Sequence, residues 1–107
     1  MHMAGFVKIG KAADVPVGQV RVFAVDGKGI AVANVGGSYY AIDNVCTHDG
    51  GPLGEGIVVN DQVECPRHGA RFDVRTGRPK ALPAALPVRT YPVEVDGEEI
   101  RVDVSPF

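Results

Sequence analysis

Four side chains able to bind a metal lie in two closely spaced pairs near the middle of this 107-residue chain. One residue separates Cys46 from His48, and two separate Cys65 from His68. Residues 49–64 stand between the pairs, and glycine is frequent around both. Thiolate and imidazole are good ligands for borderline and soft metals, and glycine lets a backbone come close to a cluster. The two pairs therefore predict two loops that present four ligands to one point.

The residue types alone leave four interpretations of these pairs. A disulfide between the two cysteines would leave both histidines unexplained, and Cys/His catalysis needs one pair rather than two. A structural zinc site is chemically sound, but its usual spacing does not divide the cysteines between two loops. A [2Fe–2S] cluster with two cysteines on one iron and two histidines on the other needs one cysteine and one histidine from each loop. The observed spacing provides that arrangement.

Both loops resemble the cluster loops of Rieske-type ferredoxins, whose signature is C-x-H followed at a similar distance by C-x-x-H. The matching stretches are "CTHDGGPLGEG", from residue 46, and "CPRHGARFDVRTG", from residue 65. The resemblance covers nearly the whole chain. It implies one [2Fe–2S] Rieske cluster as the cofactor, with Cys46 and Cys65 on the inner iron. His48 and His68 would then bind the outer iron near solvent.

The same resemblance implies a function, because the family includes the ferredoxin components of bacterial ring-hydroxylating dioxygenase systems. We therefore expect a one-electron carrier that is not itself an enzyme. It would take electrons from a flavin-dependent ferredoxin reductase and pass them to a terminal oxygenase. One alternative is the small Rieske subunit of a larger reductase, such as nitrite reductase. Another is a zinc-stabilised binding module without a redox role.

The residues around the ligands place the expected redox potential low for a Rieske centre. High-potential members of the family have a disulfide between the loops and two hydroxyl groups that donate to the cluster. Gly51 and Arg67 occupy the disulfide positions here, and Ala70 and Phe72 occupy the hydroxyl positions. With fewer hydrogen-bond donors to the cluster, the reduced and more negatively charged state is stabilised less. We therefore expect the low end of the range of roughly −150 to +300 mV.

Short strands and tight turns are predicted on both sides of the two loops. Residues 19–43 are rich in β-branched and aromatic residues, and Asp26-Gly27 and Gly36-Gly37 interrupt them at hairpin spacing. This predicts three strands joined by two tight turns. A strand at 6–10 and a hairpin within 88–104, with its turn at Asp96-Gly97, are also expected. The predicted class is all-β, a small antiparallel sandwich or barrel.

The segment 44–80 loses the period-two pattern and contains both Cys/His pairs. It predicts a loop-rich cluster-binding subdomain with one short strand at "QVEC", inserted into a single Rieske domain spanning 1–107. Pro52 and Leu53 are expected to shield the cluster from water. Phe72 and Tyr91 are expected to be core or cluster-covering aromatics rather than electron relays.

Composition narrows the class of partner and the location. A net charge of −2 and a pI near 5.8 argue against nucleic acid as a partner. We see no membrane span and no secretion signal, so a cytoplasmic location with reduced thiols is expected. A monomer is the expected state of a carrier that moves between partners.

Overall fold

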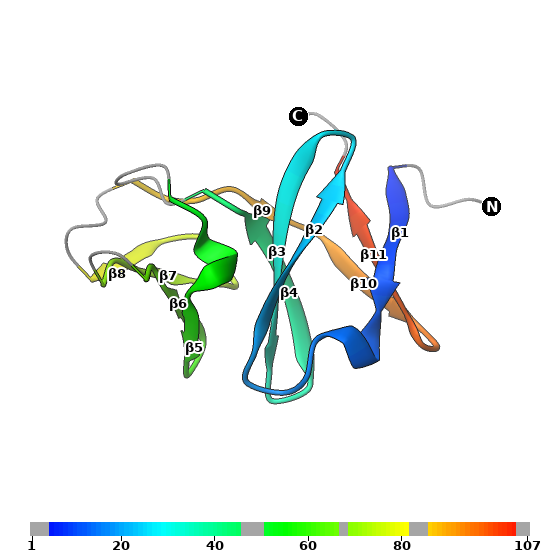
Figure 1. Ribbon diagram of the computed structural model, residues 1–107, viewed down its shortest axis with the longest axis horizontal. Helices are drawn as coiled ribbons and strands as arrows, with labels where there is room; N and C mark the ends of the chain where they lie inside the picture. The colour runs from blue at the N-terminus through cyan, green and yellow to red at the C-terminus, as the bar shows by residue number, and fades with distance from the viewer. Residues whose placement is uncertain (1–4, 46–50, 67–68, 82–85, 105–107) are drawn as a thin grey trace.

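The computed structural model describes residues 5–45, 51–66, 69–81 and 86–104. Eleven strands and two short 3₁₀ helices are formed in these ranges, and every strand pair is antiparallel. Three sheets stand next to one another along the longest axis of the molecule (Figure 1). The predicted all-β antiparallel class is confirmed. No helix in the described part of the chain is long and apolar enough to cross a membrane.

The first sheet has the order β1-β11-β10, the central sheet β2-β3-β4-β9, and the third sheet β5-β6-β7-β8. The strands of the first sheet are β1 (Phe6–Lys11), β10 (Val93–Asp96) and β11 (Glu99–Asp103). Those of the central sheet are β2 (Val20–Val25), β3 (Lys28–Val35), β4 (Ser38–Asp43) and β9 (Thr90–Tyr91). Those of the third sheet are β5 (Ile57–Val59), β6 (Gln62–Glu64), β7 (Arg71–Asp73) and β8 (Pro79–Ala81). The helices are η1 (Ala12–Asp14) and η2 (Leu53–Glu55).

The central sheet is buried on both faces, which explains the continuous apolar run of β3. Alternate residues of a strand point to opposite faces. Ile30 and Val32 pack with residues of the first sheet in one core. Ala31 and Ala33 pack with residues of the third sheet in a second core. The small alanine side chains let the third sheet approach closely, so the site region is anchored on the central layer.

The two predicted turns of the central sheet are confirmed. Asp26 and Gly27 have φ angles of 50° and 80°, and Gly36 and Gly37 have φ angles of 61° and 98°. A two-residue hairpin loop with a type I′ turn needs positive φ at both central residues. The C-terminal hairpin is also confirmed, but its turn lies one residue later than predicted. Asp96 still pairs with Glu99, so Gly97 and Glu98 form the loop.

The segment 44–80 contains more regular structure than predicted. Four strands of three residues each form a complete sheet there, whereas the sequence indicated one. The predicted strand at "QVEC" is confirmed as β6. Strands of three residues are too short to display an alternating pattern, so periodicity could not reveal the others. The division into one domain with a subdomain at 44–80 stays a prediction.

Candidate metal centre

Of the four predicted ligands, the structure describes Cys65, while Cys46, His48 and His68 lie outside the described residues. Cys65 follows β6 directly, its side chain is 1% exposed, and its thiol is free. Within the described ranges no three His, Cys, Asp or Glu side chains form a metal-binding group. Ligation of a cluster by all four residues therefore stays a prediction.

The loop that contains Cys65 is closed at its base by backbone hydrogen bonds. The Cys65 amide donates to the Ala70 carbonyl at 2.7 Å, and the Gly69 amide donates to the Cys65 carbonyl at 3.2 Å. Glu64 pairs with Arg71 across β6 and β7, and their side chains form an ion pair at 2.8 Å. Both ends of this second loop are therefore held together.

Asn44 closes the base of the first loop. Its backbone N–H donates to the Gly29 carbonyl at 3.0 Å, and its side-chain Oδ1 accepts from the backbone N–H of Gly54 at 2.6 Å. A Cβ on Gly54 would overlap a methyl group of Val22, so a larger residue here would require the Val22 side chain to move. The sequence analysis did not single out Asn44. An asparagine beside a turn is a weak signal, because its partner lies ten residues further along the chain.

A second close backbone contact brings the two loops together. A Cβ on Gly56 would overlap the Glu64 carbonyl oxygen, and Ile57 pairs with Glu64 in the register of β5 and β6. Glu64 immediately precedes Cys65. The end of the first loop is therefore held beside the start of the second, as a shared ligand site requires.

Cys65 lies in a buried cluster of apolar side chains. Leu53, Ala70 and Phe72 are each 0% exposed and belong to the same buried cluster as Cys65. The sequence analysis expected Leu53 and Phe72 in this role. A buried free thiol among apolar side chains, with the bases of both loops closed, suits a thiolate-bound iron–sulfur cluster, because such a site must control the access of water.

Asp73 stabilises the turn that follows β7, and the sequence analysis did not identify it. Its carboxylate is buried and accepts from the Arg75 amide at 2.7 Å and the Thr76 amide at 3.2 Å. Burial by itself would raise the pKa of Asp73. The hydrogen bonds from Arg75 and Thr76, with the Arg75 guanidinium, outweigh burial and lower that pKa below its ordinary value of 3.8.

A comparison with known families decides what this arrangement is. The model of the Rieske [2Fe–2S] domain matches residues 5–92. The chain belongs to this family. The match contains both described loop bases and the four predicted ligand positions. The expected family and the Rieske [2Fe–2S] cofactor are therefore confirmed, and the zinc module is not favoured.

Individual relatives of this Rieske domain agree with the family match. The chain is 39% identical to the ferredoxin component of the naphthalene 1,2-dioxygenase system of Pseudomonas aeruginosa, over 86% of this chain and 88% of the relative. It is 44% identical to the solved ferredoxin of carbazole 1,9a-dioxygenase from Nocardioides aromaticivorans IC177. That structure has a TM-score of 0.87, with 92% of this chain and 97% of the other aligned.

A further solved structure is a complex of reduced oxygenase and oxidized ferredoxin in carbazole 1,9a-dioxygenase. The matched chain is 35% identical, has a TM-score of 0.87, and aligns over 94% of both chains. These relatives confirm the prediction of a ferredoxin that is not itself an enzyme. They do not favour the alternative of a nitrite reductase subunit.

Proposed function

We propose that this Rieske protein is the ferredoxin component of a ring-hydroxylating oxygenase system. It receives electrons one at a time from a flavin-dependent reductase and delivers them to a terminal oxygenase. The observation that carries the proposal is the matched ferredoxin in complex with its oxygenase, which resembles this chain over 94% of its length. A terminal oxygenase of the same class is therefore the natural partner.

In this proposal Cys46 and Cys65 hold one iron, and His48 and His68 hold the other. When bound, the cluster supplies a centre that accepts and releases one electron. The residues of the chain set its surroundings: the hydrogen bonds of Asn44 and Cys65 close the two loops, and Leu53 excludes water from the thiolate side. Neutral imidazoles in place of two thiolates make the surroundings less negative, which favours electron uptake.

The residues near Cys65 support a potential at the low end of the Rieske range. Ala70 and Phe72 are fully buried beside Cys65 and have no side-chain donor. Hydrogen bonds to cluster sulfurs stabilise the reduced state, so their absence from these two side chains lowers the potential. A midpoint above about +100 mV, well inside the upper part of the range, would contradict this part of the proposal.

The state and location of the protein follow from the same proposal. A carrier that meets two partners in turn must leave its cluster end accessible, so we expect a monomer in solution. Reduced cysteines are needed for cluster ligation, which fits a cytoplasmic location. Light scattering at working concentration measures the first expectation.

Two measurements test the proposed function. The purified protein is expected to be red-brown, to contain two irons and two sulfides per chain, and to give a Rieske-type paramagnetic signal with a low average g value on reduction. In stopped-flow experiments, a flavin reductase of a dioxygenase system should reduce it. The reduced protein should then be reoxidised by the matching terminal oxygenase. A colourless protein with one zinc, or a reduced protein that no such oxygenase reoxidises, would overturn the proposal.

A further inference from the structure

A buried tyrosine, Tyr91, is hydrogen-bonded to Asp43, which lies shortly before the first loop. The Tyr91 hydroxyl donates to Oδ1 of Asp43 at 2.5 Å, although the two residues are 48 apart in the sequence. Tyr91 lies in β9 with 4% of its surface exposed, and Asp43 is the last residue of β4. The pairing of Ala41 with Tyr91 places β9 beside β4 at this point.

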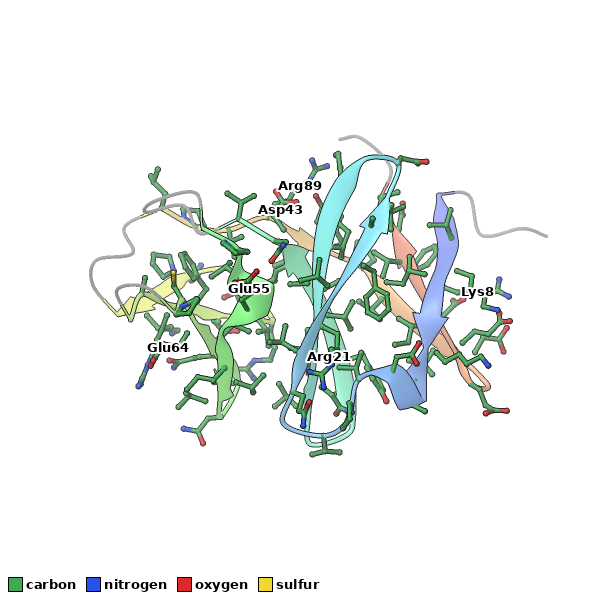
Figure 2. The ribbon with its side chains drawn as sticks, in the orientation of Figure 1. Lys8, Arg21, Asp43, Glu55, Glu64 and Arg89 are labelled. Atoms are coloured by element: carbon green, nitrogen blue, oxygen red, sulfur yellow. The ribbon has the colours of Figure 1, made fainter. Side chains whose placement is uncertain are left out.

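Arg89 completes the surroundings of this pair. Its carbonyl accepts from the Asp43 amide at 2.9 Å, so Asp43 is held through its backbone as well as its carboxylate. Its guanidinium carbon lies 5.1 Å from the centroid of the Tyr91 ring, within the range of a cation–π contact. Figure 2 shows Arg89 and Asp43 next to each other where the end of β4 meets the strand returning from the third sheet.

The hydrogen bonds continue from this pair into the loop. Asn44 follows Asp43 directly, and Asn44 is the residue that binds Gly29 on one side and Gly54 on the other. A phenylalanine at position 91 would fill the same core volume, so packing alone does not require the hydroxyl. The hydroxyl adds a hydrogen bond that holds the Asp43 side chain, and so restrains the backbone just before the first ligand pair.

We propose that Tyr91 is a positioning residue for the first cluster loop, acting through the carboxylate of Asp43. The inference rests on the proposed role of Cys46 as a ligand two residues after Asn44. With the hydroxyl removed, the Asp43 carboxylate loses its donor. Asp43 then keeps its pairing with Ile30 and its backbone bond to Arg89, but its carboxylate no longer ties the end of β4 to the Tyr91 side chain. The first loop becomes less tightly held, and the ligands that it carries vary in orientation.

The test compares Tyr91→Phe with Tyr39→Phe in the cluster-loaded protein. The Tyr39 hydroxyl donates to the Ala12 carbonyl at 3.1 Å, and Tyr39 packs against the same core as Tyr91, but its bond is directed at η1. Amide hydrogen exchange is followed in the peptide covering 43–54, together with the g values of the reduced cluster. We expect Tyr91→Phe to speed exchange in that peptide roughly tenfold and to broaden or shift the g values. Tyr39→Phe should match the wild type in both.

A second pair of variants separates the hydrogen bond from general loosening. Asp43→Asn keeps an acceptor for the Tyr91 hydroxyl and should exchange within about threefold of the wild type, whereas Asp43→Ala should resemble Tyr91→Phe. Equal losses in Asp43→Asn and Asp43→Ala would overturn the hydrogen-bond route. Faster exchange in β1 and β11 as well as in 43–54 would also overturn the inference, because it indicates global destabilisation.

The outcomes also distinguish this inference from the proposed function. A wild-type protein without a Rieske-type signal refutes the proposed function before any variant is measured. A wild type with that signal, accompanied by a Tyr91→Phe protein with unchanged g values and exchange, overturns the positioning role and leaves the proposed function standing.

Discussion

The pair formed by the first and central sheets differs from the third sheet in the length of its strands and in how closely the backbone is packed at its glycines. In that pair, strands run for up to eight residues, and open two-residue turns at Asp26-Gly27 and Gly36-Gly37 connect the central strands. A Cβ on Gly27 would meet nothing within 4 Å. In the third sheet each strand has three residues, and Gly56 is in direct contact with the backbone of Glu64.

This difference separates local from non-local control of structure. The hairpins of the central sheet need only strand formers and a turn, which neighbouring residues supply. The third sheet and the loops beside it depend on contacts between residues that lie apart in sequence, such as Asn44 with Gly54 and Gly56 with Glu64. The region that would hold the cluster is therefore the one most sensitive to single substitutions, and four experiments test that contrast.

The largest effect is expected from Cys65→Ala, which removes a proposed ligand from the third-sheet region. We expect complete loss of the visible absorbance and of the paramagnetic signal. Most of the far-UV circular dichroism should persist, because the core between the first and central sheets does not include Cys65. A variant that retains a full Rieske-type spectrum would refute the ligand assignment of Cys65.

Gly56→Ala should be the most destabilising of the substitutions that leave the ligands in place. The added methyl group would overlap the Glu64 carbonyl, and overpacking against backbone costs about 2–4 kcal/mol. Gly27→Asn is the matched control in the central sheet, because asparagine tolerates the φ of 80° and the site is open. Its cost should stay below about 1 kcal/mol in chemical denaturation. Equal costs would mean that the two regions do not differ as described.

Asp73→Ala should cost about 2 kcal/mol at neutral pH, because it removes the charged acceptor of the Arg75 and Thr76 amides in the turn after β7. The pKa of Asp73 is lowered in the folded protein, so its contribution is present above pH 3.8 and is lost as the pH falls further. Acid denaturation curves should therefore be flatter for the variant in that window. Asp96→Ala, in the exposed C-terminal hairpin, should cost less than about 1 kcal/mol. Parallel acid curves for wild type and Asp73→Ala would contradict this account.

The smallest effect is expected at alkaline pH from Tyr91, which lies where the two regions meet. Burial, then the hydrogen bond to Asp43 and its negative charge, raise the pKa of Tyr91 to about 12 from 10.0. The neutral hydroxyl is therefore favoured in the folded state, and stability falls as the pH rises between these values. The wild type should lose about 1.4 kcal/mol through this group by about pH 11, whereas Tyr91→Phe should not. Lysine titration affects both proteins alike, so only the difference between the two curves tests the prediction.

Much of the fold was predictable where patterning was local. The turns at Asp26-Gly27 and Gly36-Gly37 and the all-β class follow from residue type and spacing, because a two-residue turn needs positive φ and a strand needs alternation. The C-terminal turn was displaced by one residue, since the sequence "DGEE" offers two positions for a glycine turn. The third sheet was underestimated because pairing, not propensity, creates strands of three residues.

The candidate site divides in the same way. The family and the proposed ligand set could both be predicted from sequence, because the spacing of Cys46, His48, Cys65 and His68 is typical of two thiolates and two imidazoles on two loops. The family match confirms the cofactor, while the assignment of the four ligands stays a prediction.

Sequence by itself determined the donor chemistry, the turn positions and the absence of side-chain donors at Ala70 and Phe72. Only the tertiary structure revealed that Asn44 and Gly56 hold the two loops together and that Tyr91 binds Asp43. The reason is physical: a hydrogen bond or a close backbone contact depends on a distance in space. Asp43 and Tyr91 are 48 residues apart, and no sequence pattern links them. Only the antiparallel pairing of β4 with β9 brings them within hydrogen-bonding distance.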